Sequence, residues 1–84
     1  MFHGIIREID PHAIQSMAER GVSLNDLHDA ADHPLIVLQQ ARGRVFYLSD
    51  DAAVVLSPRG RVITTYSASD FDAKIEALLS HVHK

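Results

Sequence analysis

Three polar residues with the potential for acid–base and phosphate chemistry recur at four-residue intervals near the start of the chain. His12, Ser16 and Arg20 would share one face of a helix, because side chains four residues apart point to the same side. Cleavage of RNA by its own 2′-hydroxyl needs a group that moves protons and cations that stabilise the phosphorane. Histidine moves protons near neutral pH, and arginine binds phosphate through paired hydrogen bonds. The spacing suits such chemistry, and it equally suits the solvated face of a surface helix.

A second group of hydroxyl side chains closes a β-rich run near the C-terminal third of the chain: Thr64, Thr65, Tyr66 and Ser67. Hydroxyls can hydrogen-bond a phosphate, and the ring of Tyr66 can stack on a nucleobase or its hydroxyl can donate a proton. Threonine and tyrosine are also favoured in strands for packing alone. Both interpretations stay open at this point.

Four of the eight basic residues stand beside two turn-like segments: Arg42, Arg44, Arg59 and Arg61. In an antiparallel meander these two turns lie at the same end of the sheet, whereas Asp50 and Asp51 lie at the other end. The sequence therefore predicts a positive pole suited to a phosphate backbone or an acidic partner. Arginine at a hairpin tip is also common solubilising decoration, which is the competing explanation.

A metal site has weaker support. His28 and Asp32 stand four residues apart, and His81 and His83 flank Val82 near the end of the chain. Neither pair completes a recognised set of ligands, and without cysteine no thiolate site or disulfide can form. We therefore expect no metal ion and no other cofactor.

Capping and breaking residues predict the helices that would present these side chains. Asp10 and Pro11 begin a helix over residues 11–20, and Gly21 ends it. Ser23 begins a second helix, which stops at His33 and Pro34. The side chains expected in the core are Ala13, Ile14, Met17 and Ala18 of the first helix and Leu24, Leu27, Ala30 and Ala31 of the second.

A period of two then predicts strands at residues 35–40, 44–49, 52–57 and 61–66, joined by hairpin-length turns. Residues 3–9 are read as a short strand or an extended lead-in. Residues 52–56 are apolar throughout, which indicates a strand covered on both faces by this chain or by a partner. Ser69 caps a last amphipathic helix, with Asp72 in the capping-box position. The predicted fold is α+β: two N-terminal helices, a four-stranded antiparallel β-meander and a C-terminal helix.

Size and charge narrow the possibilities further. A chain of 84 residues forms one domain, residues 1–84, because two cores would each be too small. No apolar run approaches about 18 residues, so we expect no membrane insertion. The formal net charge of −3 opposes simple nucleic-acid binding, which favours a basic excess, so any RNA contact must use a local positive patch.

The assembled pattern resembles a known group of bacterial toxins. The similarity rests on His12-Ala13, on the run Met17-Ala18-Glu19-Arg20-Gly21-Val22-Ser23, on Asp26-Leu27 and on the strand Val62-Ile63-Thr64-Thr65-Tyr66. It spans about residues 10–67. The arrangement looks like the barnase/EndoU/colicin/RelE (BECR) superfamily of ribonuclease toxin domains. Its members include tRNA-cleaving C-termini of contact-dependent growth inhibition toxins and BrnT-like toxins of toxin–antitoxin pairs.

The resemblance implies a metal-independent endoribonuclease that cleaves tRNA by 2′-hydroxyl transesterification. It implies His12 as acid or base, Arg20 as phosphate ligand, and Thr65 and Tyr66 as further catalytic residues. Ser16 and the four turn arginines would contact RNA. A cognate immunity protein or antitoxin would neutralise the domain, which would act in the cytoplasm of a target bacterial cell after delivery within a larger secreted toxin.

Two other classes of function stay open. A non-catalytic interaction module, such as an immunity protein, antitoxin or adaptor, is favoured by the negative charge and by the doubly apolar run 52–56. A metal-dependent hydrolase is disfavoured by the incomplete ligand sets.

Overall fold

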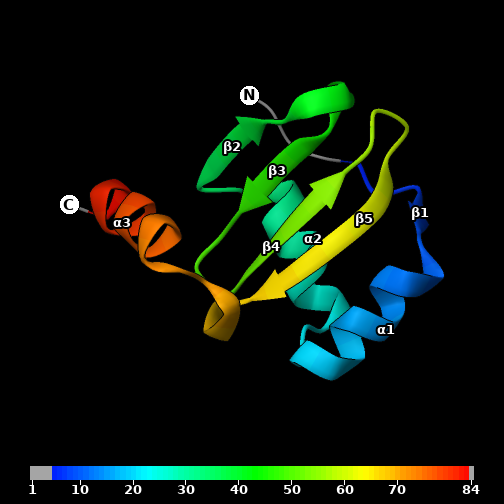
Figure 1. Ribbon diagram of the computed structural model, residues 1–84, viewed down its shortest axis with the longest axis horizontal. Coiled ribbons are helices and arrows are strands. Elements are labelled where there is room, and N and C mark those ends of the chain that lie inside the picture. The colour runs from blue at the N-terminus through cyan, green and yellow to red at the C-terminus, as the bar shows by residue number, and fades with distance from the viewer. Residues whose placement is uncertain (1–4, 84) are drawn as a thin grey trace.

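A five-stranded sheet with helices on both sides organises the chain. The computed structural model describes residues 5–83, and within that range it is an α+β fold. The strands are β1 (Glu8–Ile9), β2 (Ile36–Gln39), β3 (Val45–Leu48), β4 (Ala52–Leu56) and β5 (Arg61–Ser67). The helices are α1 (Pro11–Arg20), α2 (Leu24–Asp32) and α3 (Ala73–Val82), with short 3₁₀ turns at Ala41–Gly43 and Ala68–Asp70. The sheet order is β1-β5-β4-β3-β2 (Figure 1).

The antiparallel meander is confirmed from β2 to β5, and each strand lies within a residue or two of its predicted bounds. The predicted four-stranded sheet was incomplete, because β1 pairs in parallel with β5 through Glu8 opposite Arg61 and Ile9 opposite Val62. The sheet is therefore mixed. Of the lead-in segment 3–9, residues 3 and 4 lie outside the described residues, and the paired strand is only two residues long.

The ends of the first two helices follow the predicted chemistry. The Asp10 carboxylate accepts a hydrogen bond from the His12 backbone N–H at 2.8 Å, and Gly21 ends α1 at φ 71°. Ser23 and Asp26 form a reciprocal capping box at the start of α2. These caps fix where α1 begins and ends, and therefore where His12 and Arg20 lie.

The predicted start of the last helix was wrong. Asp72, not Ser69, caps α3, because its carboxylate accepts the Ile75 N–H at 2.9 Å. Two capping signals overlap in this stretch. Ser67 and Asp70 form a capping box around the 3₁₀ turn at Ala68–Asp70. The chain therefore makes a separate short turn before α3 begins.

Strand β4 is buried on both faces by the chain itself. Leu27, Ala31 and Val54 belong to a core between the sheet and the pair α1 and α2, and Val55 and Leu79 belong to a smaller core under α3. Figure 1 shows α2 behind the sheet and α3 beyond the β2 side. The doubly apolar run 52–56 therefore needs no partner protein to cover it.

Some predicted core residues face outward instead. Ile14 is 54% exposed and Leu24 is 57% exposed, and Ala18 is exposed as well. No helix within residues 5–83 has the length and apolar character that a membrane span requires.

Candidate functional site

The candidate catalytic residues separate into two clusters along the paired elements α1 and β5. His12 stands in the first turn of α1, and Arg20 is its last residue. Eight residues at 1.5 Å each put about 12 Å along the helix axis between them. The start of α1 lies by the start of β5 and Arg20 lies by its end, so the structure does not bring the His12 and Arg20 side chains into one cluster. Ser16 lies between them and is partly buried.

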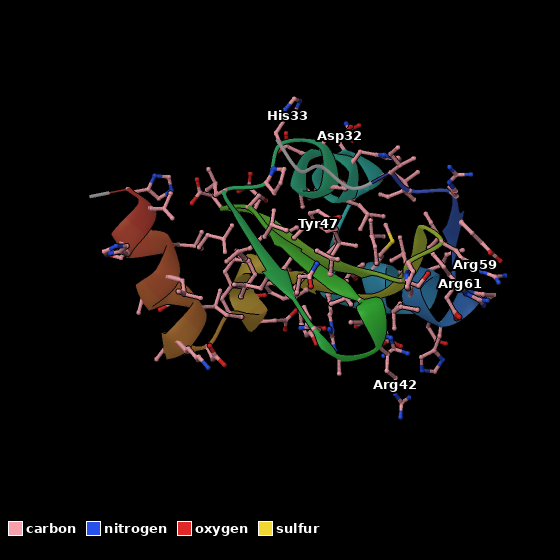
Figure 2. The ribbon with its side chains drawn as sticks, turned by 90° about the horizontal axis from the view of Figure 1, so that it is seen from above. Asp32, His33, Arg42, Tyr47, Arg59 and Arg61 are labelled. Atoms are coloured by element: carbon pink, nitrogen blue, oxygen red, sulfur yellow. The ribbon has the colours of Figure 1, made fainter. Side chains whose placement is uncertain are left out.

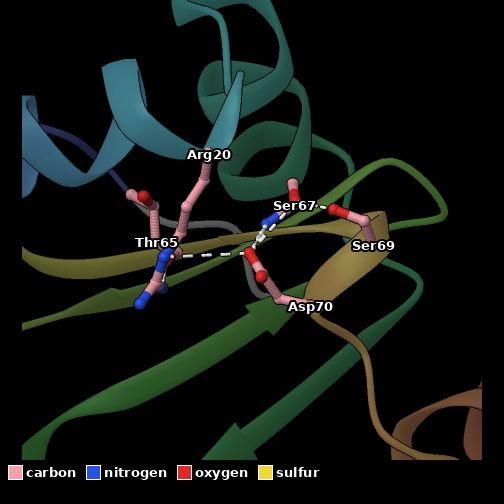
Figure 3. Close-up of polar contacts among 5 residues, drawn as sticks. All are labelled: Arg20, Thr65, Ser67, Ser69 and Asp70. Carbon is pink, nitrogen blue, oxygen red and sulfur yellow. Dashed lines mark hydrogen bonds and ion pairs between the residues drawn. The ribbon is translucent and has the colours of Figure 1, made fainter.

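Arg20 is held by three neighbours at and just after the end of β5, of which Figure 3 shows Thr65 and Asp70. Its Nη1 donates to the backbone carbonyl of Thr65 at 2.6 Å, and its Nε lies 3.8 Å from Asp70 Oδ2. The guanidinium carbon lies 5.3 Å from the centre of the Tyr66 ring, a cation–π distance. The side chain is still 38% exposed, so the fixed guanidinium can also receive an anion from solvent.

The short strand β1 explains why Arg20 lies against β5. Within the described residues β1 pairs only with Arg61 and Val62, so the following part of β5 has no strand neighbour on that side. Arg20 donates to Thr65 in this part of the edge. The guanidinium takes a position that a neighbouring strand would otherwise occupy.

Asp70 is a site residue that sequence analysis missed. Its Oδ2 accepts hydrogen bonds from the Ser67 N–H at 3.1 Å and from the Ser67 hydroxyl at 3.0 Å. The Ser67 backbone N–H, then the Ser67 hydroxyl, lower the pKa of Asp70 below its usual range, and the charge of Arg20 adds to this effect. Asp70 therefore stays ionised beside Arg20. The Ser67–Asp70 capping spacing was the signal that could have revealed it.

Thr65 and Tyr66 have different environments. The Thr65 side chain is 0% exposed and, like its partner Val54, faces the core under α1 and α2. Its hydroxyl has no hydrogen-bond partner within residues 5–83. That hydroxyl is out of reach of a substrate, so we move Thr65 from the proposed catalytic group to a positioning role through its carbonyl. Tyr66 packs on the other side, with its ring 6.4 Å from the Phe46 ring and only partly buried.

His12 is exposed and adjoins an ion pair rather than the Arg20 cluster. Asp10, two residues earlier, accepts a 2.6 Å hydrogen bond from Nη2 of Arg61. The His12 backbone N–H is the main cause that lowers the pKa of Asp10, and the Arg61 guanidinium lowers it further. The carboxylate thus joins the start of α1 to the start of β5.

The prediction that the two arginine-bearing turns lie at the same end of the sheet is confirmed, and the turns also touch. A Cβ placed on Gly43 would lie 2.9 Å from Pro58 Cγ, so the β2–β3 turn packs directly against the β4–β5 turn. Figure 2 shows Arg42, Arg59 and Arg61 toward one end of the molecule. Arg7 joins this group, because its backbone N–H donates to the Gly60 carbonyl at 2.9 Å. We call the set Arg7, Arg42, Arg44, Arg59 and Arg61 the arginine end.

The arginines of this end differ in available charge. Arg61 is neutralised by Asp10, whereas the other four form no ion pair within residues 5–83. At the opposite end of the sheet Asp50 pairs with His83 at 2.7 Å. Asp50 therefore lies away from the arginine end, where Asp10 is the carboxylate that pairs with an arginine within residues 5–83. In the part of the chain that the structure describes, no three His, Cys, Asp or Glu side chains gather to hold a metal ion.

Comparison with known proteins gives one curated likeness. No family model and no solved structure matches the chain. The chain is 39% identical over 64 residues, 76% of its length, to the tRNA nuclease WapA of Bacillus subtilis (strain 168). It spans about 3% of the length of that protein. The likeness agrees with a nuclease, while membership of the BECR superfamily stays a prediction.

Proposed function

We propose that this chain is a metal-independent endoribonuclease domain that cleaves tRNA. The observation that carries the proposal is its 39% identity to a tRNA nuclease across three quarters of the chain. The matched protein is far longer, so the activity of this segment is an inference from likeness. The arginine end adds support, because it offers a phosphate backbone four cations that form no ion pair within residues 5–83, despite the net charge of −3.

The proposed reaction is attack of a ribose 2′-hydroxyl on the adjacent phosphorus. The oxygen–phosphorus bond forms as the 2′-proton leaves, the 5′-oxygen departs and takes up a proton, and a 2′,3′-cyclic phosphate remains. We assign proton transfer to His12, which is exposed. Arg20, fixed by Thr65 and Asp70, binds another phosphate of the same strand and so holds the substrate.

The separation of about 12 Å along α1 sets how RNA would lie on the domain. One phosphate cannot contact both clusters through short hydrogen bonds while Arg20 stays bound to Thr65. We propose that the strand lies along α1 and β5, with Ser16 between the two clusters, so that different phosphates meet His12 and Arg20. Tyr66, beside Arg20, offers a face on which a base can stack.

The test uses the purified chain, bulk tRNA and excess EDTA. We expect cleavage with EDTA present, and a loss of about 10²-fold or more in rate for His12→Ala. Arg20→Ala should also lose activity. His28→Ala is the matched control, because His28 is an exposed histidine on α2. Intact tRNA with the wild-type chain, or equal rates for His12→Ala and wild type, would contradict the proposal.

As further parts of the proposal, a cognate immunity protein or antitoxin neutralises the domain, and the site of action is the cytoplasm of a target bacterial cell. Expression of the chain alone should then arrest growth, and coexpression of the neighbouring reading frame should relieve the arrest.

A non-catalytic interaction module is the second candidate. The outward-facing side chains of Ile14 and Leu24 favour it, since large apolar residues exposed on adjoining helices can form a contact surface. The strand β4 no longer supports it, because both faces are covered within the chain. This candidate predicts harmless expression of the chain alone and intact tRNA in the EDTA assay.

A further inference from the structure

A pocket at the arginine end takes no part in the chemistry described so far. Its volume is about 260 Å³, and its lining residues are Ile5, Arg7, Val45, Tyr47, Leu56, Ser57, Pro58, Arg59 and Gly60. We propose that this pocket binds one nucleotide of the RNA, with the phosphate toward the arginines and the base or ribose toward Tyr47. The inference rests on the proposed function and adds a binding site for the substrate.

The charge of the pocket points to an anion. Arg7 and Arg59 both line it, both are exposed, and within residues 5–83 neither forms an ion pair. Two guanidinium groups from separate segments can bind a phosphate more firmly than one, because each offers several N–H donors. The Asp10 carboxylate is already paired with Arg61, so it leaves Arg7 and Arg59 free to bind an anion.

Tyr47 is the second observation that points to a ligand. The residue is only 8% exposed, and its hydroxyl forms no hydrogen bond within residues 5–83 but is not fully buried, so it still reaches solvent. It lines the pocket and also an adjoining hollow of about 180 Å³ with Val37, Gln39 and Val45. A phenol that is open to a pocket can take a hydrogen-bond partner from a ligand in place of water. A ribose hydroxyl or a base edge would supply that partner.

Ser57 offers a further donor. Its Oγ accepts the Arg61 backbone N–H at 3.1 Å, which leaves the hydroxyl proton free to bind an acceptor in the pocket. Apolar side chains of Val45 and Leu56 complete the lining. The mixture of two cations, two hydroxyls and an apolar wall matches a nucleotide better than a bare phosphate or an apolar ligand.

The walls of the pocket are set by the backbone. Gly60 has φ +83°, and a Cβ at that position would lie 2.5 Å from the Ile5 carbonyl oxygen. The Arg7 N–H donates to the Gly60 carbonyl, which fastens the lead-in to the β4–β5 turn. Arg7 and Arg59 are therefore brought together before any ligand binds, which reduces the ordering cost of binding.

The size of the pocket limits the ligand. About 260 Å³ falls just below the usual range of roughly 300–1,000 Å³ for small-molecule sites. That space suits a single nucleotide, while the rest of the strand continues over the surface. The pocket lies at the end where α1 begins, so the bound strand would continue toward His12.

The first experiment separates binding from chemistry in the full chain. Arg7→Ala and Arg59→Ala should each raise KM for tRNA about 10-fold, the loss typical of a charge-assisted hydrogen bond, with kcat unchanged. Tyr47→Phe removes only the hydroxyl and should raise KM with the fold intact. Lys74→Ala, an exposed cation on α3, is the control. Wild-type KM for all three pocket variants in an active enzyme would overturn the inference while leaving the proposed function in place.

The second experiment probes the pocket without any turnover. Uridine 5′-monophosphate, uridine and inorganic phosphate are titrated separately while the backbone amide signals of Arg7 and Gly60 are followed by NMR. We expect the monophosphate to shift these signals at the lowest concentration, and Arg59→Ala to abolish the shift. This result in a chain that leaves tRNA intact would retain the nucleotide site and reject the ribonuclease. Equal shifts with phosphate alone, or none with the monophosphate, would reject the site.

Discussion

Arg20 illustrates what residue spacing can and cannot predict. The four-residue intervals correctly place His12, Ser16 and Arg20 on α1. They say nothing of which part of β5 each side chain meets, because that depends on the tilt and offset of the helix against the sheet. The start of α1 lies at the ion pair between Asp10 and Arg61. Its end lies at Thr65 and Asp70, which both contact Arg20. Helical periodicity thus predicts a face, whereas the contacts across elements come only from the packed fold.

The buried hydroxyl of Thr65 allows its role to be tested. Thr65→Val keeps the branched shape and removes an oxygen that has no partner in the described residues. We expect the free energy of unfolding to rise by roughly 1 kcal/mol, since a buried unpaired polar group is removed. The rate of tRNA cleavage should stay at the wild-type level, because the carbonyl that binds Arg20 remains.

Urea denaturation measures the stability of this variant and the tRNA assay its activity. A large loss of activity in a folded Thr65→Val chain would return the hydroxyl to the catalytic group.

Asp10 should make part of the stability depend on pH. Its pKa is lowered from 3.8 in the folded chain, chiefly by the His12 N–H and then by Arg61. A lowered carboxyl pKa stabilises the fold above pH 3.8, and this contribution is lost as the pH falls through the lower folded-state pKa. Asp10→Asn keeps a capping acceptor but loses the charge.

The free energies of unfolding of wild type and Asp10→Asn should therefore differ near neutral pH and converge below pH 3.8. Denaturant titrations at several pH values provide the measurement. A difference that stays constant down to acid pH would show that the charge contributes nothing.

At the scale of elements, the strands were the most predictable part of the chain. Alternating apolar residues and short turns locate β2 to β5 without knowledge of the fold. Residues 3–9 were read as a short strand or an extended lead-in, but the parallel pairing of β1 with β5 was not predicted, because two residues carry too little periodicity to indicate a partner strand. The start of α3 was misplaced for a different reason: Ser67–Asp70 and Ser69–Asp72 are equivalent as capping signals in sequence, and packing decides between them.

The β4–β5 turn has a glycine that the pocket wall requires. Gly60→Ala combines a left-handed φ of +83° with a contact 2.5 Å from the Ile5 carbonyl. Gly21 is the matched control, because it has φ +71° and no atom within 4 Å of an added Cβ. We expect Gly21→Ala to cost about 1 kcal/mol of unfolding free energy for the backbone conformation alone. Gly60→Ala should cost a further 1–3 kcal/mol, roughly, for the collision.

Both glycine variants are compared by chemical denaturation under one set of conditions. Equal losses would mean that the lead-in can move away from the turn. That result would contradict the inference that the pocket wall is formed before a ligand binds.

At the scale of the whole molecule, the net charge misrepresents what RNA would meet. The chain totals −3, yet four arginines without ion-pair partners in the described part of the chain stand at one end. Composition alone opposed nucleic-acid binding, and only the meander topology, read from the turns, placed these charges together. The contribution of Arg7 was not predictable, since it depends on the parallel pairing of β1.

This separation of charge predicts a steep salt dependence. If four arginines each neutralise one phosphate, the slope of log K against log salt is about −0.7 to −0.9 per contact. Raising the salt from about 50 to about 200 mM should then weaken tRNA binding roughly 50- to 150-fold. Fluorescence anisotropy with the His12→Ala chain measures binding without cleavage. A slope of log K against log salt smaller in magnitude than the value for one phosphate contact would exclude the arginine end as the RNA-binding surface.

The position of Arg20 beside β5 has a practical consequence for any search for an inhibitor protein. That guanidinium shields a length of sheet margin that would otherwise be free to join a foreign strand. An Arg20→Ala chain used to capture such a protein would expose this sheet edge, so we expect it to self-associate and to bind unrelated proteins. The variant His12→Ala leaves Arg20 on the sheet edge, because His12 lies away from it. That variant is therefore better suited to capturing a binding protein.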